Sequence, residues 1–328
     1  MRVVAIEEHF MHPDVEAAIV SPDAAEARPL PGLRSRELSR RLADLGRERL
    51  AMMDDCGVDV QVLSLSEPGL QTLAPPAAVR LQAIVNDAIA EAVRAHPDRY
   101  QGFATLATSD PPRAAEELRR AVTELGLHGA HLFGRTLEKN LDHPDMWPIF
   151  EVAADLRAPI YLHPGVPRAS VREAYYSGFG EELDQAFATF GIGWHYEAGI
   201  QLLRLALGGV FDRFPSLALI TGHWGEVVLF YLERVEPLLA QAGRERSLHE
   251  YMRANVYVTP SGMFSERYLR WTLEVLGPER IMFSTDYPFR LAGGGAARAF
   301  LAQAQLAPEA RERIASGNWE RLVAAIRR

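Results

Sequence analysis

Residues 3–9, VVAIEEH, begin with an apolar run that is typical of a buried strand. The stretch ends in three polar residues, Glu7, Glu8 and His9. Side chains alternate between the two faces of a strand, so Glu7 and His9 point to one face and Glu8 points to the other. A carboxylate and an imidazole side by side at a strand end suit one half of a divalent metal site. Taken alone, the stretch is explained equally well as a solvated strand end.

The composition is that of an ordinary globular protein. The chain has 328 residues, of which 48% are hydrophobic and 24% are charged. A net charge of −8, without a block of Lys and Arg, argues against a nucleic-acid partner. Cys56 is the only cysteine, which excludes an internal disulfide. No signal peptide precedes the first strand and no apolar run is long enough to span a bilayer, which predicts a soluble, cytoplasmic protein with no membrane partner.

Eight short apolar runs, each followed by a helical segment, organise the chain. This alternation predicts a parallel sheet with crossover helices. Eight such units favour a single closed (β/α)8 barrel over residues 1–328, of the TIM type, rather than an open doubly wound sheet. The absence of a glycine-rich dinucleotide fingerprint after the first strand also argues against the open sheet. The predicted strands are residues 3–6, 58–66, 100–107, 126–134, 159–163, 217–221, 256–259 and 280–284.

The segments between these strands read as helices, with two exceptions. Residues 12–33 are rich in proline and too polar for a core, and residues 164–191 form a long, aromatic-rich insertion after strand five. Apolar residues at helical spacing predict the helices. These cover residues 36–56, a segment from Pro76, 111–125, 148–156, 202–207, 226–240 and a segment around Trp319.

Imidazoles and carboxylates stand at the ends of four predicted strands. Glu7 and His9 end the first strand and His163 ends strand five. His223 and Glu226 follow strand six, and Asp286 follows strand eight. Strand ends meet at the mouth of a barrel, where barrel enzymes carry their active sites. Each residue alone also fits a cap, a turn or a first-turn acid that suits the helix dipole. The combination favours an active site.

The remaining histidines are scattered. His195, beside Trp194, is a candidate to line the pocket. The others are interpreted as structural or surface residues: His12, His96, His128, His131, His143 and His249.

Six motifs together carry a family resemblance. They are EEHF (residues 7–10), LHP (162–164), GGVFDRFP (208–215), GHWGE (222–226), SG (261–262) and FSTDYPF (283–289). They resemble the amidohydrolase superfamily, in the branch of the γ-resorcylate, 2,3-dihydroxybenzoate and 5-carboxyvanillate decarboxylases. The resemblance implies a barrel of the metal-dependent hydrolase type and a carboxy-lyase activity.

Carried over by position, the resemblance implies one divalent metal ion, Mn or Zn. It implies that His223 stays off the metal and works with Glu226. The implied metal ligands are Glu7, His9, His163 and Asp286.

The resemblance also implies two arginines at the substrate. Arg234 matches an arginine that contacts the substrate, and Arg34 matches one that enters the neighbouring subunit's site, which implies a homodimer or homotetramer. The sequence departs from the family pattern at Gly165, where arginine is usual, at Phe133, where asparagine is common, and at the glycines 293–295. These departures concern the ring substituents of the substrate.

The chemistry that fits these residues is non-oxidative decarboxylation of a hydroxybenzoate-like acid. The metal would chelate the carboxylate and its ortho phenolate, and Asp286 would protonate the ring carbon with a proton relayed by His223 and Glu226. Two alternatives remain: a hydrolase of an amide, lactone or ester in the same superfamily, and a non-catalytic metal-binding protein. The candidates for apolar walls around the ring are Phe10, Trp194, Trp224, Tyr287 and Phe289.

Overall fold

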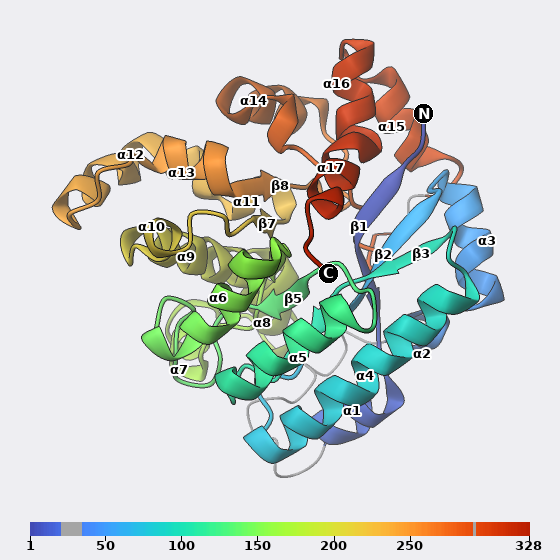
Figure 1. Ribbon diagram of the computed structural model, residues 1–328, viewed down its shortest axis with the longest axis horizontal. Coiled ribbons are helices and arrows are strands. Elements are labelled where there is room, and N and C mark those ends of the chain that lie inside the picture. The colour runs from blue at the N-terminus through green and yellow to red at the C-terminus, as the bar shows by residue number, and fades with distance from the viewer. Residues whose placement is uncertain (21–34, 291–292) are drawn as a thin grey trace.

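A ring of parallel strands surrounded by helices makes up the computed structural model (Figure 1), which describes residues 1–20, 35–290 and 293–328. The strands pair in two sheets, in the orders β1-β2-β3 and β4-β5-β6-β7-β8. Every residue of β1 and β2 is buried, as expected for barrel strands that are covered on both faces. The strands are β1 (Val4–Phe10), β2 (Val60–Leu65), β3 (Tyr100–Gly102), β4 (Ala104–Thr105), β5 (Ala130–Phe133), β6 (Ile160–His163), β7 (Leu219–Thr221) and β8 (Val256–Val258).

The predicted eighth strand, residues 280–284, closes the ring without forming a regular strand. Met282 N–H donates to Val258 O at 2.9 Å, and Ile6 N–H donates to Phe283 O at 3.0 Å. These bonds join the segment to β8 on one side and to β1 on the other through isolated bridges. The predicted (β/α)8 barrel is therefore confirmed, with an irregular eighth position.

The predicted third strand, residues 100–107, is divided into β3 and β4. Phe103, between them, donates its N–H to Leu63 O at 2.9 Å. β3 pairs with β2, whereas β4 pairs with β5. The two short strands thus follow one another along one wall of the barrel and join the two sheets.

The helices surround this ring (Figure 1). They are α1 (Pro13–Ile19), α2 (Arg36–Ala43), α3 (Arg47–Cys56), α4 (Pro75–Ala95), α5 (Pro111–Thr123), α6 (Trp147–Leu156), α7 (Ala169–Tyr175), α8 (Glu181–Ala186), α9 (Gly193–Leu207), α10 (Val210–Arg213), α11 (His223–Glu226), α12 (Val228–Gln241), α13 (Leu248–Asn255), α14 (Glu266–Leu276), α15 (Ala296–Gln303), α16 (Pro308–Glu312) and α17 (Asn318–Ala324). Shorter turns of helix are η1 (Pro144–Met146), η2 (Phe187–Gly191), η3 (Pro278–Arg280) and η4 (Arg313–Gly317). None of the helices in the described ranges combines the length and apolar character needed to cross a membrane.

Two helical predictions need correction. The helix predicted over residues 36–56 is broken between α2 and α3, because the Asp44 side chain accepts Arg49 N–H at 2.6 Å and so starts a second helix. The stretch predicted to be too polar for the core contains α1, whose Val15 and Ile19 are fully buried. The insertion after strand five contains α7 and α8.

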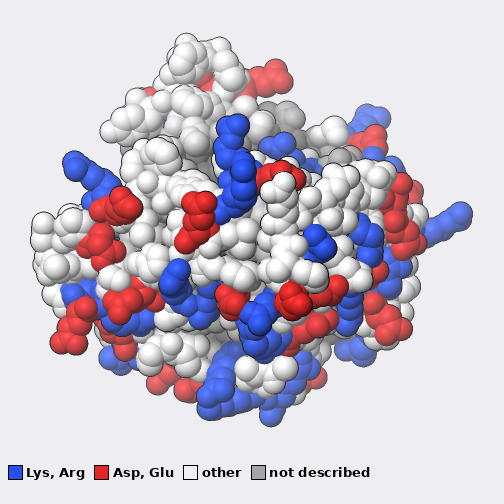
Figure 2. Space-filling view, turned by 90° about the horizontal axis from the view of Figure 1, so that it is seen from above, with Lys and Arg blue, Asp and Glu red and all other residues white. Residues whose placement is uncertain are grey.

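The surface drawn in Figure 2 mixes charges of both signs. Lys and Arg side chains lie among Asp and Glu side chains over the face shown. On this face the charges are too mixed to form the continuous basic stripe with which nucleic-acid-binding proteins contact phosphates.

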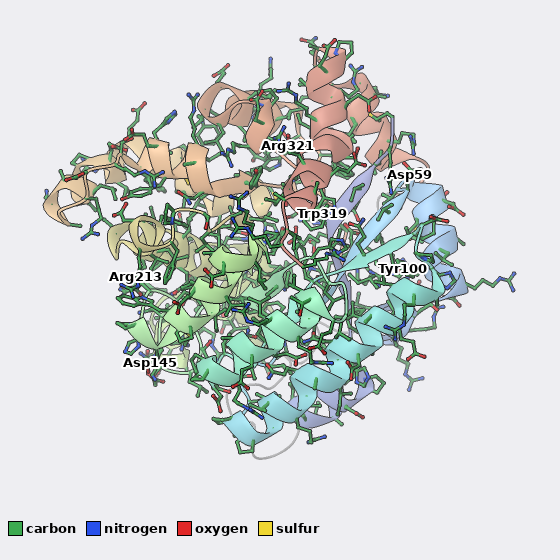
Figure 3. The ribbon with its side chains drawn as sticks, viewed as in Figure 1. Asp59, Tyr100, Asp145, Arg213, Trp319 and Arg321 are labelled. Atoms are coloured by element: carbon green, nitrogen blue, oxygen red, sulfur yellow. The ribbon has the colours of Figure 1, made fainter. Side chains whose placement is uncertain are left out.

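One end of the barrel is filled by a tryptophan. Trp319, on α17, is buried and packs with Val4, Ile6 and Phe103 of the ring (Figure 3). Its indole N–H donates to Gln101 Oε1 at 2.7 Å. The strands begin at this end, so the open mouth lies at the opposite end, where the strands finish.

Candidate active site

The structure brings four predicted ligands together at the mouth of the barrel. Glu7 and His9 come from β1, His163 from the end of β6, and Asp286 from the segment after the eighth wall position. Each offers one ligand atom, and these atoms all lie within 4.8 Å of one another. Glu7 and His9 share one face of β1, as the alternation of side chains requires.

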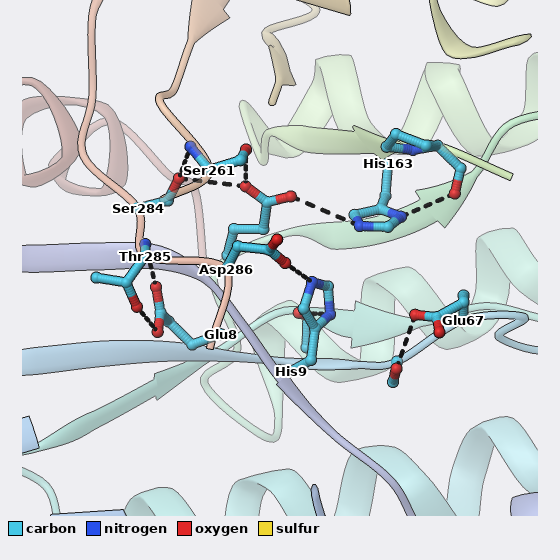
Figure 4. Close-up of polar contacts among 12 residues, drawn as sticks. Glu8, His9, Glu67, His163, Ser261, Ser284, Thr285 and Asp286 are labelled. Carbon is cyan, nitrogen blue, oxygen red and sulfur yellow. Dashed lines mark hydrogen bonds and ion pairs between the residues drawn. The ribbon is translucent and has the colours of Figure 1, made fainter. Parts of the chain in front are cut away.

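Three hydroxyl groups orient Glu7. Its Oε2 accepts hydrogen bonds from Ser261, from Ser284 at 3.2 Å and from Thr259 at 3.5 Å (Figure 4). Its Oε1 is buried and has no hydrogen-bond partner among the described residues. The carboxylate is therefore held by one oxygen, and the other is free to bind a ligand.

The two histidines also direct their Nε2 atoms into the same space. His163 Nδ1 donates to Pro164 O at 2.8 Å, so Nε2 carries the lone pair of the neutral ring. That nitrogen lies 3.5 Å from Glu7 Oε1, and His9 Nε2 lies 3.4 Å from Asp286 Oδ1. His9 Nε2 has no hydrogen-bond partner within the described ranges. Imidazole nitrogens and carboxylate oxygens that converge in this way are the donor set that a divalent cation binds.

Burial sets the protonation of this cluster. It lowers the pKa of His163 and of His9, which keeps both rings neutral, the form in which imidazole binds metals. It raises the pKa of Asp286 to about 7, against the opposing charges of His223 and Arg290. Two imidazoles and two carboxylates, with Glu7 Oε1 and His9 Nε2 unpartnered among the described residues, fit a divalent metal such as zinc or manganese.

A second cluster joins two histidines through one carboxylate. Glu226 Oε1 pairs with His223 Nδ1 at 2.7 Å, and its Oε2 pairs with His195 Nδ1 at 2.9 Å. Burial opposes the charge of Glu226, but the attraction of His223 and His195 lowers the pKa of Glu226 to about 2. Burial likewise lowers the pKa of His223, but Glu226 outweighs it and raises that pKa to about 9.

The segment that carries His223 is strained. His223, Trp224, Glu226 and Val227 all have positive φ, between 49° and 63°. Such angles are costly for residues with side chains and often occur at functional sites. Gly222, just before this segment, lies close to the candidate metal ligands. An added Cβ would stand 2.5 Å from Ser261 Oγ and 3.2 Å from Glu7 Oε1.

A cavity of about 790 Å³ opens beside both clusters. His163, Asp286, His223, His195 and Glu226 lie on its wall. The rest of its lining is mainly apolar and aromatic, which suits a flat organic ligand. Among these apolar residues are Trp194, Trp224, Phe289, Tyr268, Trp271, Phe190, Tyr196, Phe230 and Tyr231.

The other predicted site residues lie elsewhere. Phe10 packs in the core between barrel and helices, and the Tyr287 ring packs against the Arg49 guanidinium, 4.6 Å away. Both therefore fail to reach the cavity that they were expected to wall. Arg234 is exposed on α12 and is not among the cavity residues. Arg34 lies outside the described residues.

Comparison with known proteins places the chain in a family. The sequence profile described as amidohydrolase matches residues 9–324. The chain belongs to the amidohydrolase family. This confirms the resemblance carried by the six motifs.

The sequence relatives of this amidohydrolase include several decarboxylases. The γ-resorcylate decarboxylase of Polaromonas sp. is 34% identical over 301 residues, covering 87% of this chain and 88% of the relative. Decarboxylase orsB of Emericella nidulans is 33% identical over 293 residues, covering 88% and 86%.

Solved structures of similar proteins share the whole amidohydrolase fold. 5-Carboxyvanillate decarboxylase LigW from Sphingomonas paucimobilis has a TM-score of 0.89 at 32% identity and 99% coverage of both chains. A dihydroxybenzoic acid decarboxylase from Polaromonas sp., with bound manganese and the inhibitor 2-nitroresorcinol, has a TM-score of 0.84 at 30% identity, covering 98% and 97%. These four relatives are thus decarboxylases, and one of them holds manganese.

The structure adds residues that sequence reasoning on this amidohydrolase missed or left open. His195 belongs to the Glu226 cluster, and Arg290 and Glu67 line the cavity. Glu67 follows β2, so its position at a strand end is a signal that could have identified it. Arg290 stands four residues after Asp286. His131 is buried inside the ring with its two nitrogens unpartnered in the described structure, which corrects the surface alternative for this residue.

Proposed function

We propose that this protein is a metal-dependent, non-oxidative decarboxylase of a hydroxybenzoate-like aromatic acid. The observation that carries the proposal is a set of unpartnered metal-binding atoms next to a histidine–carboxylate cluster on an aromatic-lined cavity. Relatives that decarboxylate aromatic acids support it. Incubation of the metal-loaded protein with a panel of 2-hydroxybenzoates should release CO2 and the matching phenol from at least one member. No turnover of any member would contradict the proposal.

Glu7, His9, His163 and Asp286 would hold one divalent ion, Mn or Zn. When bound, such an ion supplies a Lewis acid for the carboxylate and ortho oxygen of the substrate. Manganese in the Polaromonas structure supports this choice.

Asp286 is the proposed acid toward the ring. Its carboxyl transfers a proton to the ring carbon that bears the carboxylate, and the carbon–carbon bond then breaks with loss of CO2. The bonding electrons restore the aromatic ring, so no oxidant or reductant is required. Burial raises the pKa of Asp286 to about 7 in the metal-free protein, whereas a bound cation would lower it, so a neighbouring group has to supply the proton that Asp286 passes on.

His223 is the proposed source of the replacement proton. Its pKa of about 9 keeps the ring protonated at neutral pH, since Glu226 stabilises the positive charge. His195 shares that carboxylate and receives a hydrogen bond from the Trp194 indole at 3.1 Å. Both contacts help to fix the orientation of the pair.

Arg290 is the proposed anchor for a polar group on the far side of the ring. Among the described residues that line the cavity, it is the one lysine or arginine. It lines the same cavity as Asp286, and its charge partly opposes the rise in the pKa of Asp286 that burial causes. An arginine there suits a carboxylate or hydroxyl substituent.

Replacing Arg290 with glutamine is expected to raise KM about fivefold and to change kcat less, the effect of an exposed ion pair worth about 1 kcal/mol. Steady-state kinetics would measure it. Arg234→Gln, analysed in parallel, tests the arginine predicted from the sequence. An unchanged KM in Arg290→Gln would remove Arg290 from the substrate site.

We also propose that the protein is a homodimer or homotetramer. Large apolar side chains are exposed on the insertion and the adjoining helices, and exposed apolar areas of this kind mark protein interfaces. Four of them also line the cavity: Phe190, Tyr196, Phe230 and Tyr231. A second subunit on this surface would lie next to the active site, where Arg34 is predicted to contribute.

Light scattering should therefore find no stable monomer at assay concentration. Mixing Arg34→Ala with His223→Asn protein should restore part of the activity, because mixed oligomers contain sites with both residues intact. A fully active monomer, or no complementation in mixtures shown to exchange subunits, would contradict the role of Arg34.

A further inference from the structure

A buried polar network lies behind β1, on the face opposite the proposed metal site. Glu8, Gln61 and Arg49 are at most 2% exposed. Gln61 links the other two: its Nε2 donates to Glu8 Oε2 at 2.9 Å, and its Oε1 accepts Arg49 Nε–H at 2.7 Å. Burying these polar groups is costly unless their contacts are well made.

Glu8 fixes the residue before Asp286. Its two oxygens accept the Thr285 N–H at 2.8 Å and the Thr285 hydroxyl at 2.6 Å (Figure 4). With Gln61, three donors thus converge on one buried carboxyl group, and two of them come from one residue. Thr285 is bound to β1 by its main chain and its side chain together.

Arg49 fixes the residues on the other side. Its guanidinium donates to His9 O at 2.8 Å and lies over the Tyr287 ring at 4.6 Å. Tyr287 O in turn accepts His9 N–H at 2.8 Å. The same arginine therefore contacts β1 and the segment that carries Asp286, two of the three wall segments that provide proposed ligands.

Asp286 stands between these two fixed residues with φ of 59°, in the left-handed region. A residue with a side chain rarely adopts this conformation unless its neighbours impose it. We infer that the Glu8–Gln61–Arg49 network is a positioning device that holds Asp286 in this conformation and so sets the spacing of Asp286 and His9. The inference rests on the metal site proposed above, and it assigns Glu8 and Arg49 no contact with substrate.

The chain offers a matched control. Glu117 is also a buried carboxylate between barrel and helices, where it accepts Asn86 Nδ2–H at 2.8 Å and pairs with Arg120. Asn86 binds the Thr105 main chain on β4. Glu117→Gln thus perturbs a similar network that does not contact the proposed ligands.

The test compares Glu8→Gln with Glu117→Gln by two measurements. In metal-free protein, amide hydrogen exchange over residues 283–287 should become at least about tenfold faster in Glu8→Gln and stay unchanged in Glu117→Gln. In Mn²⁺ titrations followed by electron paramagnetic resonance, Glu8→Gln should bind roughly 10- to 100-fold more weakly, the usual cost of losing a group that orients a ligand. In kinetic assays kcat should fall more than KM rises.

A folded Glu8→Gln protein with wild-type exchange and wild-type Mn²⁺ affinity would overturn the inference. If Glu8→Gln does not fold, Thr285→Val provides the test instead, because it removes only the hydrogen bond from the Thr285 hydroxyl to Glu8. It should shift both measurements in the same direction by a smaller factor. If the wild type itself binds no Mn²⁺, the proposed metal site fails, whereas the exchange measurement still tests the positioning of Asp286.

Discussion

Replacing His223 with asparagine is expected to lower kcat by about 10²- to 10⁴-fold, the usual contribution of a positioned proton donor. The metal content should not change, because the four candidate ligands do not include His223. Asparagine retains a polar group next to Glu226 but cannot carry the proton. Steady-state kinetics together with elemental analysis of the purified variant would measure both effects.

The pH dependence of the wild type provides a second measure of the same role. Since Glu226 raises the pKa of His223 to about 9, the stability that protonated His223 contributes is complete just below pH 6.5, where Glu226 is ionised, and declines as the pH rises through 9. The proton for turnover should be lost over the same upper range of pH.

The control for His223→Asn is His249→Asn, on α13, which makes the same substitution away from the cavity and should leave kcat unchanged. Loss of metal from His223→Asn in proportion to activity would contradict this role.

Replacing Glu7 with glutamine is expected to abolish metal binding and activity together. Removal of a group that only orients a ligand weakens metal affinity about 10- to 100-fold. Loss of a ligand itself should therefore weaken it by more than about 100-fold. Glutamine would place either an amide nitrogen or a weaker oxygen ligand at the position of Oε1. Metal titration and kinetic assays measure the two losses, and Glu233→Gln, an exposed substitution on α12, is the control.

Removal of the metal from the wild type should have the same effect. Chelation should eliminate turnover, and Mn²⁺ or Zn²⁺ added back should restore it at one ion per chain. Purified protein without a stoichiometric metal, together with activity that survives chelation, would contradict the metal site.

The fold could be predicted because its strands are short, mainly apolar runs separated by helical patterns. β1 and β2 are buried on both faces, and such runs are recognisable in a single sequence. The irregular parts could not be predicted in the same way. Residues 280–284 close the barrel through single bridges, and the break before α3 depends on a hydrogen bond from Arg49 N–H to Asp44. Closure of the ring by residues 280–284 is decided by tertiary contacts rather than by local pattern.

The candidate ligands could be predicted because a barrel places its strand ends together, so that residues at different strand ends lie close in space although they are far apart in the sequence. Residues outside the strand ends were harder to assign. His195 reaches Glu226 from α9, and Tyr287 turns toward Arg49 although it follows Asp286 directly. The alternation of β1 predicts that Glu8 points away from Glu7, but its contact with Thr285 depends on closure of the ring.

The most direct test of the proposed decarboxylation is turnover of a 2-hydroxybenzoate in D2O by the metal-loaded enzyme. We expect equal amounts of CO2 and phenol, with one deuterium on the ring carbon that carried the carboxylate, because protonation at that carbon releases CO2. Mass spectrometry and proton NMR of the product would locate the label, and Asp286→Asn should form almost none of it. Cleavage of an amide, lactone or ester without any CO2 release would contradict the proposal and favour a hydrolase.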